Sequence, residues 1–192
     1  MVHPLWFMAA VSRWFPVLLG LIIVISAGEA RADEYRSRLV TIEHDGPGQL
    51  AAFAEKIRPG AVTKALSQVL LGSGGSSSRG GMDPLVDELF MRVQQILDMP
   101  MPKLKVNIKL FRNQRILSEE CERLTGKPTD APAFYFKGKN TIHLHMERLS
   151  IGILAHEMAH CIMDHYFVIQ PPPKISEMLC QYVDREVSGG RF

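Results

Sequence analysis

The chain has 192 residues, a formal net charge of +2 at pH 7 and a hydrophobic share of 46%. A near-neutral charge argues against a nucleic-acid partner, because nucleic-acid-binding proteins usually carry a strongly basic surface. Residues 33–192 are enough for one domain with a hydrophobic core.

Residues 1–32 have the pattern of a Sec-type signal peptide. Arg13 precedes an apolar run at residues 15–27, and residues 30–32, Ala-Arg-Ala, supply a small-x-small cleavage pattern. The apolar run is shorter than the roughly 20 residues that a membrane-spanning helix needs. We therefore expect cleavage after Ala32, export to the periplasm or the medium, and no stable membrane span in the mature chain. An uncleaved anchor is the alternative.

The first elements after this segment are a predicted strand at residues 38–43 and predicted helices at residues 49–58 and 62–71. Residues 72–81 then consist of glycine and serine with one arginine, a composition that can hardly hold regular structure. We interpret residues 72–81 as a flexible loop inside the domain of residues 33–192, not as a domain boundary.

A helix is predicted to begin at Asp83, a suitable cap, with Pro84 in its first turn. Residues 104–111 then alternate as a strand, and residues 115–124 form a predicted helix that Gly126 ends. The predicted buried side of the first helix contains Leu85, Leu89, Val93, Ile96 and Leu97. Strands with helices between them indicate an α+β fold.

Two short β-prone runs follow at residues 133–136 and 141–146, and the polar residues 137–140 between them are typical of a hairpin turn. In the second run His143 and His145 alternate with apolar residues, so one face is apolar and the other carries histidines. Alternating histidines of this kind are typical of the solvated face of an edge strand.

The sequence His156-Glu157-Met158-Ala159-His160 is the strongest motif. Four residues apart on a helix, the two imidazoles lie on one face and can bind one metal ion. Glu157 projects about 100° around the axis, where a carboxylate can act as a general base without being a ligand. Their stripe continues through Leu149, Ile153 and Met163, so we expect a buried helix face.

A catalytic zinc usually has three protein ligands, so a third is needed. Three prolines, residues 171–173, separate the first helix from a second predicted helix at residues 174–183. Glu177 lies near the start of that helix, beside an apolar face of Ile175, Met178, Leu179, Tyr182 and Val183. It is the favoured ligand. The alternative for Glu177 is an ordinary acid at a helix N-terminus. His165 and Asp164 are weaker ligands because of their spacing.

This pattern, the His156-to-His160 motif followed by a short connection and Ser176-Glu177-Met178-Leu179-Cys180-Gln181-Tyr182, resembles the gluzincin zinc metallopeptidases, particularly small bacterial members of the peptidase MA-like group. The resemblance implies a zincin-like single domain, with a small mixed sheet, an active-site helix and a C-terminal ligand-bearing helix. It also implies Zn²⁺ bound by His156, His160 and Glu177, and a zinc-activated water deprotonated by Glu157. The chain departs from the family at Met178 and Cys180, where small residues are common.

The resemblance also implies that the strand at residues 141–146 is an edge strand at the rim of the cleft, against which an extended substrate pairs. His143 and His145 would then be candidates to contact the substrate or the developing oxyanion. Tyr182 is a further candidate oxyanion donor, as are Tyr135 and Tyr166.

The chain has three cysteines, Cys121, Cys161 and Cys180, an odd number that leaves at least one without an intrachain partner. In an oxidising compartment, Cys161 and Cys180 could bridge the two ligand-bearing helices. Buried free thiols are the alternative.

The function predicted from the sequence is therefore an exported zinc metallopeptidase that hydrolyses a peptide or protein substrate, with no nucleic-acid partner. The alternative is a non-catalytic zinc-stabilised binding protein of the cell envelope. Glu157 discriminates between them, because a purely structural zinc site has no need for an acid at that position.

Overall fold

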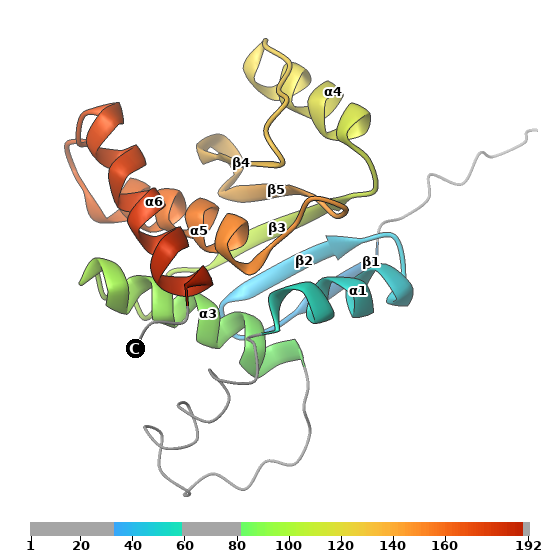
Figure 1. Cartoon of the computed structure of the whole chain (residues 1–192), viewed down its shortest axis with the longest axis horizontal. Coiled ribbons are helices and arrows are strands. Elements are labelled where there is room, and N and C mark those ends of the chain that lie inside the picture. The colour runs from blue at the N-terminus through green and yellow to red at the C-terminus, as the bar shows by residue number, and fades with distance from the viewer. Residues whose placement is uncertain (1–32, 59–81, 190–192) are drawn as a thin grey trace, which may run out of the picture. The chain divides into compact units, whose positions relative to one another are not determined.

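The fold is a mixed α+β arrangement, seen in a computed structural model that describes residues 33–58 and 82–189 (Figure 1). The predicted signal peptide, the predicted helix at residues 62–71 and the glycine-serine loop at residues 72–81 lie outside the described residues. Within the described part of the chain, no helix is both long enough and apolar enough to cross a membrane.

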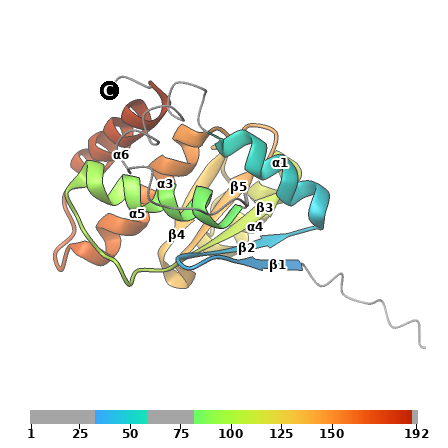
Figure 2. The same ribbon diagram turned by 90° about the horizontal axis from the view of Figure 1, so that it is seen from below.

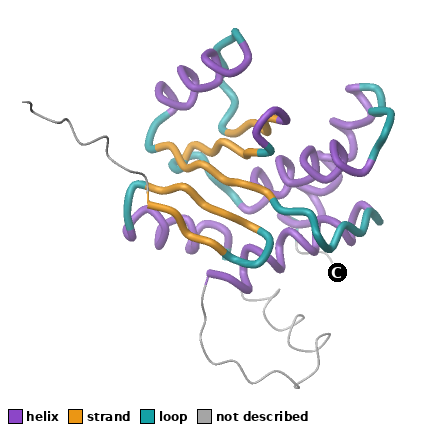
Figure 3. The backbone as a smooth tube through the Cα atoms, turned by 180° about the vertical axis from the view of Figure 1, so that it is seen from behind, coloured by secondary structure: helices purple, strands orange, loops and turns teal. Residues whose placement is uncertain are grey.

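A five-stranded sheet forms the centre of the described structure, in the order β1-β2-β3-β5-β4 (Figure 3). Its strands are β1 (Asp33–Arg36), β2 (Val40–His44), β3 (Val106–Phe111), β4 (Ala133–Phe136) and β5 (Thr141–His145). The three central strands β2, β3 and β5 run parallel, while β1 and β4 pair antiparallel at the two edges. The sheet is therefore mixed.

Helices cover both faces of this sheet. They are α1 (Pro47–Ile57), α3 (Met82–Leu97), α4 (Gln114–Thr125), α5 (Ile151–Tyr166) and α6 (Pro173–Ser188). Helices α1, α3 and α5 contact one another on one face, α6 packs on α5, and α4 lies on the other face (Figures 1 and 2). Helix α5 is consequently held between the sheet and α6.

The main core fills the space between the sheet and the α1, α3 and α5 layer. Its fully buried large side chains include Ile42, Ile108, Ile142 and Leu144 from the strands and Phe90, Leu154, Met158 and Ile162 from the helices. The strand residues come from alternate positions because successive side chains point to opposite faces. Burial of this apolar area fixes α5, and with it the predicted metal ligands, against the sheet.

Local signals position the ends of the helices that matter for the site. Ser150 caps α5, where its side chain accepts a hydrogen bond from the backbone N–H of Ile153 at 3.2 Å. Helix α6 begins with Pro173 in its first turn, as the proline run predicts. Likewise, Gly126 ends α4 in the left-handed conformation with φ 79°, as predicted.

The predicted strand before α5 exists, but its predicted place at the sheet edge is wrong. β5 pairs with β3 on one side and with β4 on the other, so β4 is the edge strand. All of β5 is buried, including His143 and His145. The histidines are buried because α4 packs over the face of β5 that they occupy, a contact between elements distant in the sequence.

β1 was not predicted from the sequence. Its residues, Asp-Glu-Tyr-Arg, carry no apolar alternation, and its side chains are mostly exposed. Its place is fixed by backbone pairing with β2 and by Asp87 of α3, which accepts hydrogen bonds from the Ser37 hydroxyl at 2.7 Å and the Leu39 N–H at 3.0 Å. A buried carboxylate thus fastens the β1–β2 turn to a helix.

Candidate metal centre

Helices α5 and α6 bring the predicted ligands together. The Nε2 atom of His156 lies 3.6 Å from one carboxylate oxygen of Glu177, and the Nε2 atom of His160 lies 3.7 Å from the other. The two imidazole rings are 5.1 Å apart between centroids. One acidic side chain from α6 therefore faces two histidines of α5.

These separations test whether a cation fits. They are too long for hydrogen bonds, so the three groups converge without bonding to one another. Ligand atoms around a tetrahedral zinc lie about 3.3–3.8 Å apart, which follows from bond lengths of about 2.0–2.3 Å. The nitrogen and oxygen donors are also of the kind that zinc takes. The residues present fit a divalent cation.

The prediction that both imidazoles are buried is wrong. The side chains of His156 and His160 are 20% and 30% exposed, and Glu177 is about half exposed. The buried face of α5 is instead formed by Leu154, Met158 and Ile162. The histidines occupy the flank between this face and solvent, so a ligand bound between the two helices is accessible from outside.

Glu157 is the buried acid of the site, with only 8% of its surface exposed. Burial raises its pKa to about 8, and the nearby Glu177 carboxylate raises it further. A backbone hydrogen bond from Tyr135 on β4 acts in the opposite direction. Desolvation, followed by the nearby His156, also lowers the pKa of His160, which favours the neutral form of its imidazole.

Cys180 is a site residue that the sequence did not identify as a ligand. Its side chain is fully buried, and its sulfur lies with the ligand atoms of His156 and His160 in a group whose members are all within 4.8 Å of one another. Burial, followed by the charges of Glu157 and Glu177, raises the pKa of the thiol. The sequence contained one signal for this role: Cys180 follows Glu177 by three residues, and residues at that spacing lie on the same face of a helix.

Gln181 also supports the site. Its side-chain amide donates a hydrogen bond to a carboxylate oxygen of Glu177 at 3.2 Å, one helical turn away. This contact orients the half-exposed carboxylate of Glu177. The four-residue spacing of Glu177 and Gln181 is visible in the sequence, but nothing there indicates that this part of α6 faces α5.

The structure places His143 and His145 away from this centre. His143 stacks on Phe134, with ring centroids 4.5 Å apart, and its Nε2 lies 3.9 Å from the Glu120 carboxylate on α4. His145 is equally buried, and its partner is Glu147 at 3.7 Å. Both lie on the face of the sheet opposite α5, so neither lines the candidate metal centre.

The outer face of α6 also differs from the prediction. Ile175, Met178 and Tyr182 are about half exposed, while Cys180 and Val183 are buried. Tyr182 lies five residues after Glu177, which turns it about 140° around the helix axis from that carboxylate. The prediction of an amphipathic helix is confirmed, but the predicted rotation of that helix about its own axis is wrong.

The two rejected ligand candidates have other partners. Asp164 accepts a hydrogen bond from the Tyr135 hydroxyl at 3.2 Å and pairs with Lys137. His165 is exposed and its Nδ1 lies 2.9 Å from the Cys161 carbonyl oxygen.

The hypothesis of a disulfide between Cys161 and Cys180 is wrong, because all three cysteines are free thiols. Cys161 points toward Asn140 and donates to its Oδ1 at 3.1 Å, away from Cys180.

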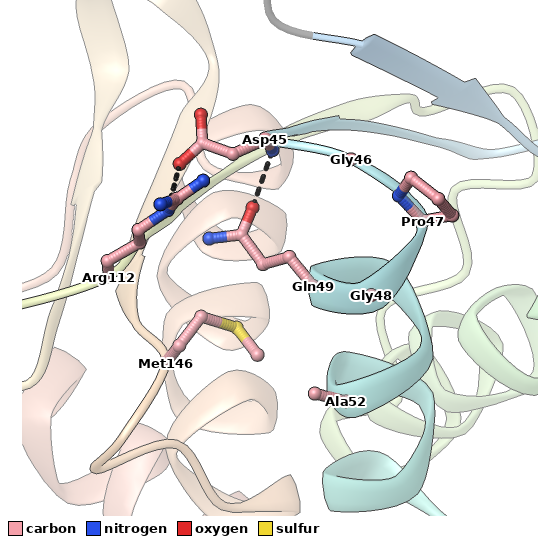
Figure 4. A pocket seen from close by; sticks show the side chains of 8 residues that line it. All are labelled: Asp45, Gly46, Pro47, Gly48, Gln49, Ala52, Arg112 and Met146. Carbon is pink, nitrogen blue, oxygen red and sulfur yellow. Dashed lines mark hydrogen bonds and ion pairs between the residues drawn. The ribbon is translucent and has the colours of Figure 1, made fainter.

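A hollow of about 420 Å³ lies apart from the α5–α6 centre, between the start of α1 and the end of β3 (Figure 4). Its lining includes Arg112, Asp45 and Gln49. The Arg112 guanidinium is paired with Asp45 at 2.9 Å, and the Asp45 N–H donates to Gln49 at 2.7 Å. The charges that line this hollow neutralise each other, so it is a poorer candidate than the α5–α6 centre.

The comparisons with known proteins add no further identification: no family model, no curated protein and no solved structure matches this chain.

Proposed function

We propose that the chain is an exported zinc-dependent metallopeptidase with a zincin-like arrangement of sheet and helices, in which His156, His160 and Glu177 hold the metal and Glu157 is the general base. The observation that carries this proposal is the approach of both Glu177 oxygens to the two imidazole Nε2 atoms, at 3.6 and 3.7 Å, from a separate helix. Such convergence of unbonded donors is what a metal ion requires.

When bound, zinc supplies Lewis-acid chemistry, which polarises a carbonyl group and makes water more acidic. The chain's own residues supply the rest. Glu157 follows the first ligand directly and lies in a buried environment, so its carboxylate can accept a proton from the attacking water. The same carboxyl group then delivers that proton to the leaving amine.

The edge strand β4 supports a peptide as the substrate. Among the described strands β4 pairs with β5 alone, so an extended peptide could add along its other edge, next to the Tyr135 amide that bonds Glu157. Tyr135 of β4 also forms the backbone hydrogen bond to Glu157, which places this edge beside the proposed base. A peptide bound along β4 would therefore run past the catalytic carboxylate.

The second candidate function is a non-catalytic zinc site that joins α5 to α6 in an envelope binding protein. The specific observation in its favour is Cys180, a fourth donor close to the two histidines. A site closed by four protein ligands is typical of structural zinc. The two functions differ in whether a substrate can reach the metal.

Glu157→Gln separates them. This substitution keeps the shape of the side chain but removes the base, so we expect unchanged zinc content and peptidase activity lower by about 10²–10⁴-fold on an unfolded protein substrate. Glu147→Gln, which changes an exposed acid on the opposite side of the sheet, is the control and should keep full activity. A zinc-loaded wild-type protein that cleaves nothing in a peptide library would favour the non-catalytic function.

A further inference from the structure

Cys180 is a buried thiol that the proposed catalytic cycle does not use. Its side chain is 0% exposed, and it lies on the side of α6 that faces α5, one turn from Glu177. A buried thiol is often only a small apolar side chain. Here, however, the sulfur and the ligand atoms of His156 and His160 all lie within 4.8 Å of one another.

The other two thiols have different surroundings. Cys161 donates to Asn140 at 3.1 Å, and Cys121 lies 3.7 Å from the hydroxyl of Thr125. Among residues 33–58 and 82–189, Cys180 is the one cysteine whose sulfur belongs to a group of potential metal donors. The chain therefore contains two matched cysteines against which its role can be measured.

We propose that Cys180 is a fourth protein ligand that occupies the open coordination position of the metal centre in the resting protein and is displaced when substrate binds. The proposal rests on the proposed function. It adds an inactive resting state, in which the Cys180 thiolate occupies the coordination position that the substrate would need.

The chemistry of this step is balanced by one proton. A coordinating thiol is deprotonated outright, because the cation's charge favours the thiolate. The S–H bond breaks, a sulfur–metal bond forms, and the proton passes to the buffer. Displacement reverses this: an incoming oxygen donor takes the position and the sulfur is reprotonated in its buried site.

Cobalt substitution tests the inference without relying on activity. Co²⁺ bound to a thiolate gives a charge-transfer band in the near ultraviolet, which nitrogen and oxygen ligands do not produce. We expect this band in the wild-type chain and in the Cys121→Ser/Cys161→Ser double variant, whose only thiol is Cys180. Calorimetric titration of zinc in buffers of different ionisation enthalpy should show one proton more released by this double variant than by Cys180→Ser.

Acetohydroxamate, a chelating oxygen ligand, tests whether the Cys180 thiolate can be displaced from the metal. We expect saturating acetohydroxamate to remove the band while Co²⁺ stays bound to the protein. Absence of the band from the cobalt-loaded double variant would overturn the inference and leave the proposed function intact. A band that persists with acetohydroxamate would overturn displacement. Together with an inactive zinc form, it would count against the proposed function as well.

Discussion

Two pairs of histidines in this chain differ in what surrounds them. His143 and His145 lie two residues apart on a strand and are almost fully buried, and His143 stacks on Phe134 and faces Glu120 of α4. His156 and His160 lie four residues apart on α5, are partly exposed, and face Glu177 and the Cys180 sulfur. Within the described residues, potential metal donors converge at the second pair and not at the first.

The comparison teaches that burial alone does not make a histidine functional. On β5 the imidazoles fill space, and the pKa of His143 falls to about 4 chiefly because burial disfavours its charged form. On α5 each imidazole Nε2 instead lies 3.6 or 3.7 Å from a Glu177 oxygen, too far for a hydrogen bond. Convergence of unbonded donors distinguishes a metal centre from a packed core.

The largest effect expected at the α5 pair comes from its carboxylate. Glu177→Ala should weaken zinc binding by more than about 100-fold, because even groups that only orient a metal ligand contribute about 10–100-fold. Glu147→Ala removes the acid 3.7 Å from His145 and should leave zinc affinity unchanged. Competition with a fluorescent chelator measures both. Equal affinities for the two variants would place the metal elsewhere.

The histidines of β5 should instead affect how the free energy of unfolding changes at acid pH. His143 has its pKa lowered to about 4 from 6.5, so between these values the unfolded chain binds a proton that the folded chain does not. Its contribution is fully present above about pH 6.5 and is lost as the pH falls toward 4, by about 3 kcal/mol in all. His143→Phe keeps the stacking on Phe134 and should remove this part of the pH dependence of urea unfolding. A variant as acid-sensitive as the wild type would contradict this.

A substitution at the contact between α5 and α6 should change the free energy of unfolding by less than the His143 effect. A Cβ on Gly152 would lie 1.9 Å from an Asp184 oxygen and 2.1 Å from the Ser188 hydroxyl, so Gly152→Ala must displace the hydrogen-bonded pair that these residues form. Gly48→Ala, in α1, meets open space and serves as the control. Both changes gain helix propensity, so their difference isolates the contact. The atoms displaced are the ends of side chains that can turn away, so we expect Gly152→Ala to be less stable than Gly48→Ala by about 1–2 kcal/mol, for one lost hydrogen bond and one displaced side chain. Equal unfolding free energies would show that α6 can move away without cost.

The smallest effect is expected from the group that holds Glu177. Gln181→Ala removes one exposed hydrogen bond of 3.2 Å and should weaken zinc binding by about 10-fold, at the lower end for an orienting group. Arg185→Ala, another exposed position on α6, should not change it. The same competition titration applies, and an unchanged affinity for Gln181→Ala would mean that the carboxylate needs no support.

The sequence predicted the α5 metal motif and the neighbouring helix because both depend on local spacing. A period of four residues brings His156 and His160 together wherever the helix lies. The prolines ahead of Lys174 likewise mark the start of α6 by a local rule. The approach of Glu177 to the histidines also requires the rotation of α6 on α5, which neither local signal specifies.

The sequence could not predict which face of α6 or β5 would be covered. Cys180 becomes a site residue only through the rotation of α6 on α5, two helices that also approach closely at Gly152. The histidines of β5 are buried only because α4 lies over them, although their alternation is typical of a solvated strand. Both features depend on contacts between elements distant in the chain.

Zinc content measures the central claim most directly. The wild-type chain and the His156→Ala/His160→Ala variant would be loaded with zinc, desalted and analysed by mass spectrometry, beside a His143→Phe/His145→Phe variant. We predict one zinc per chain for the wild type and the β5 variant, and none for the α5 variant. Zinc retained by the α5 variant, or lost only from the β5 variant, would contradict a metal centre between α5 and α6.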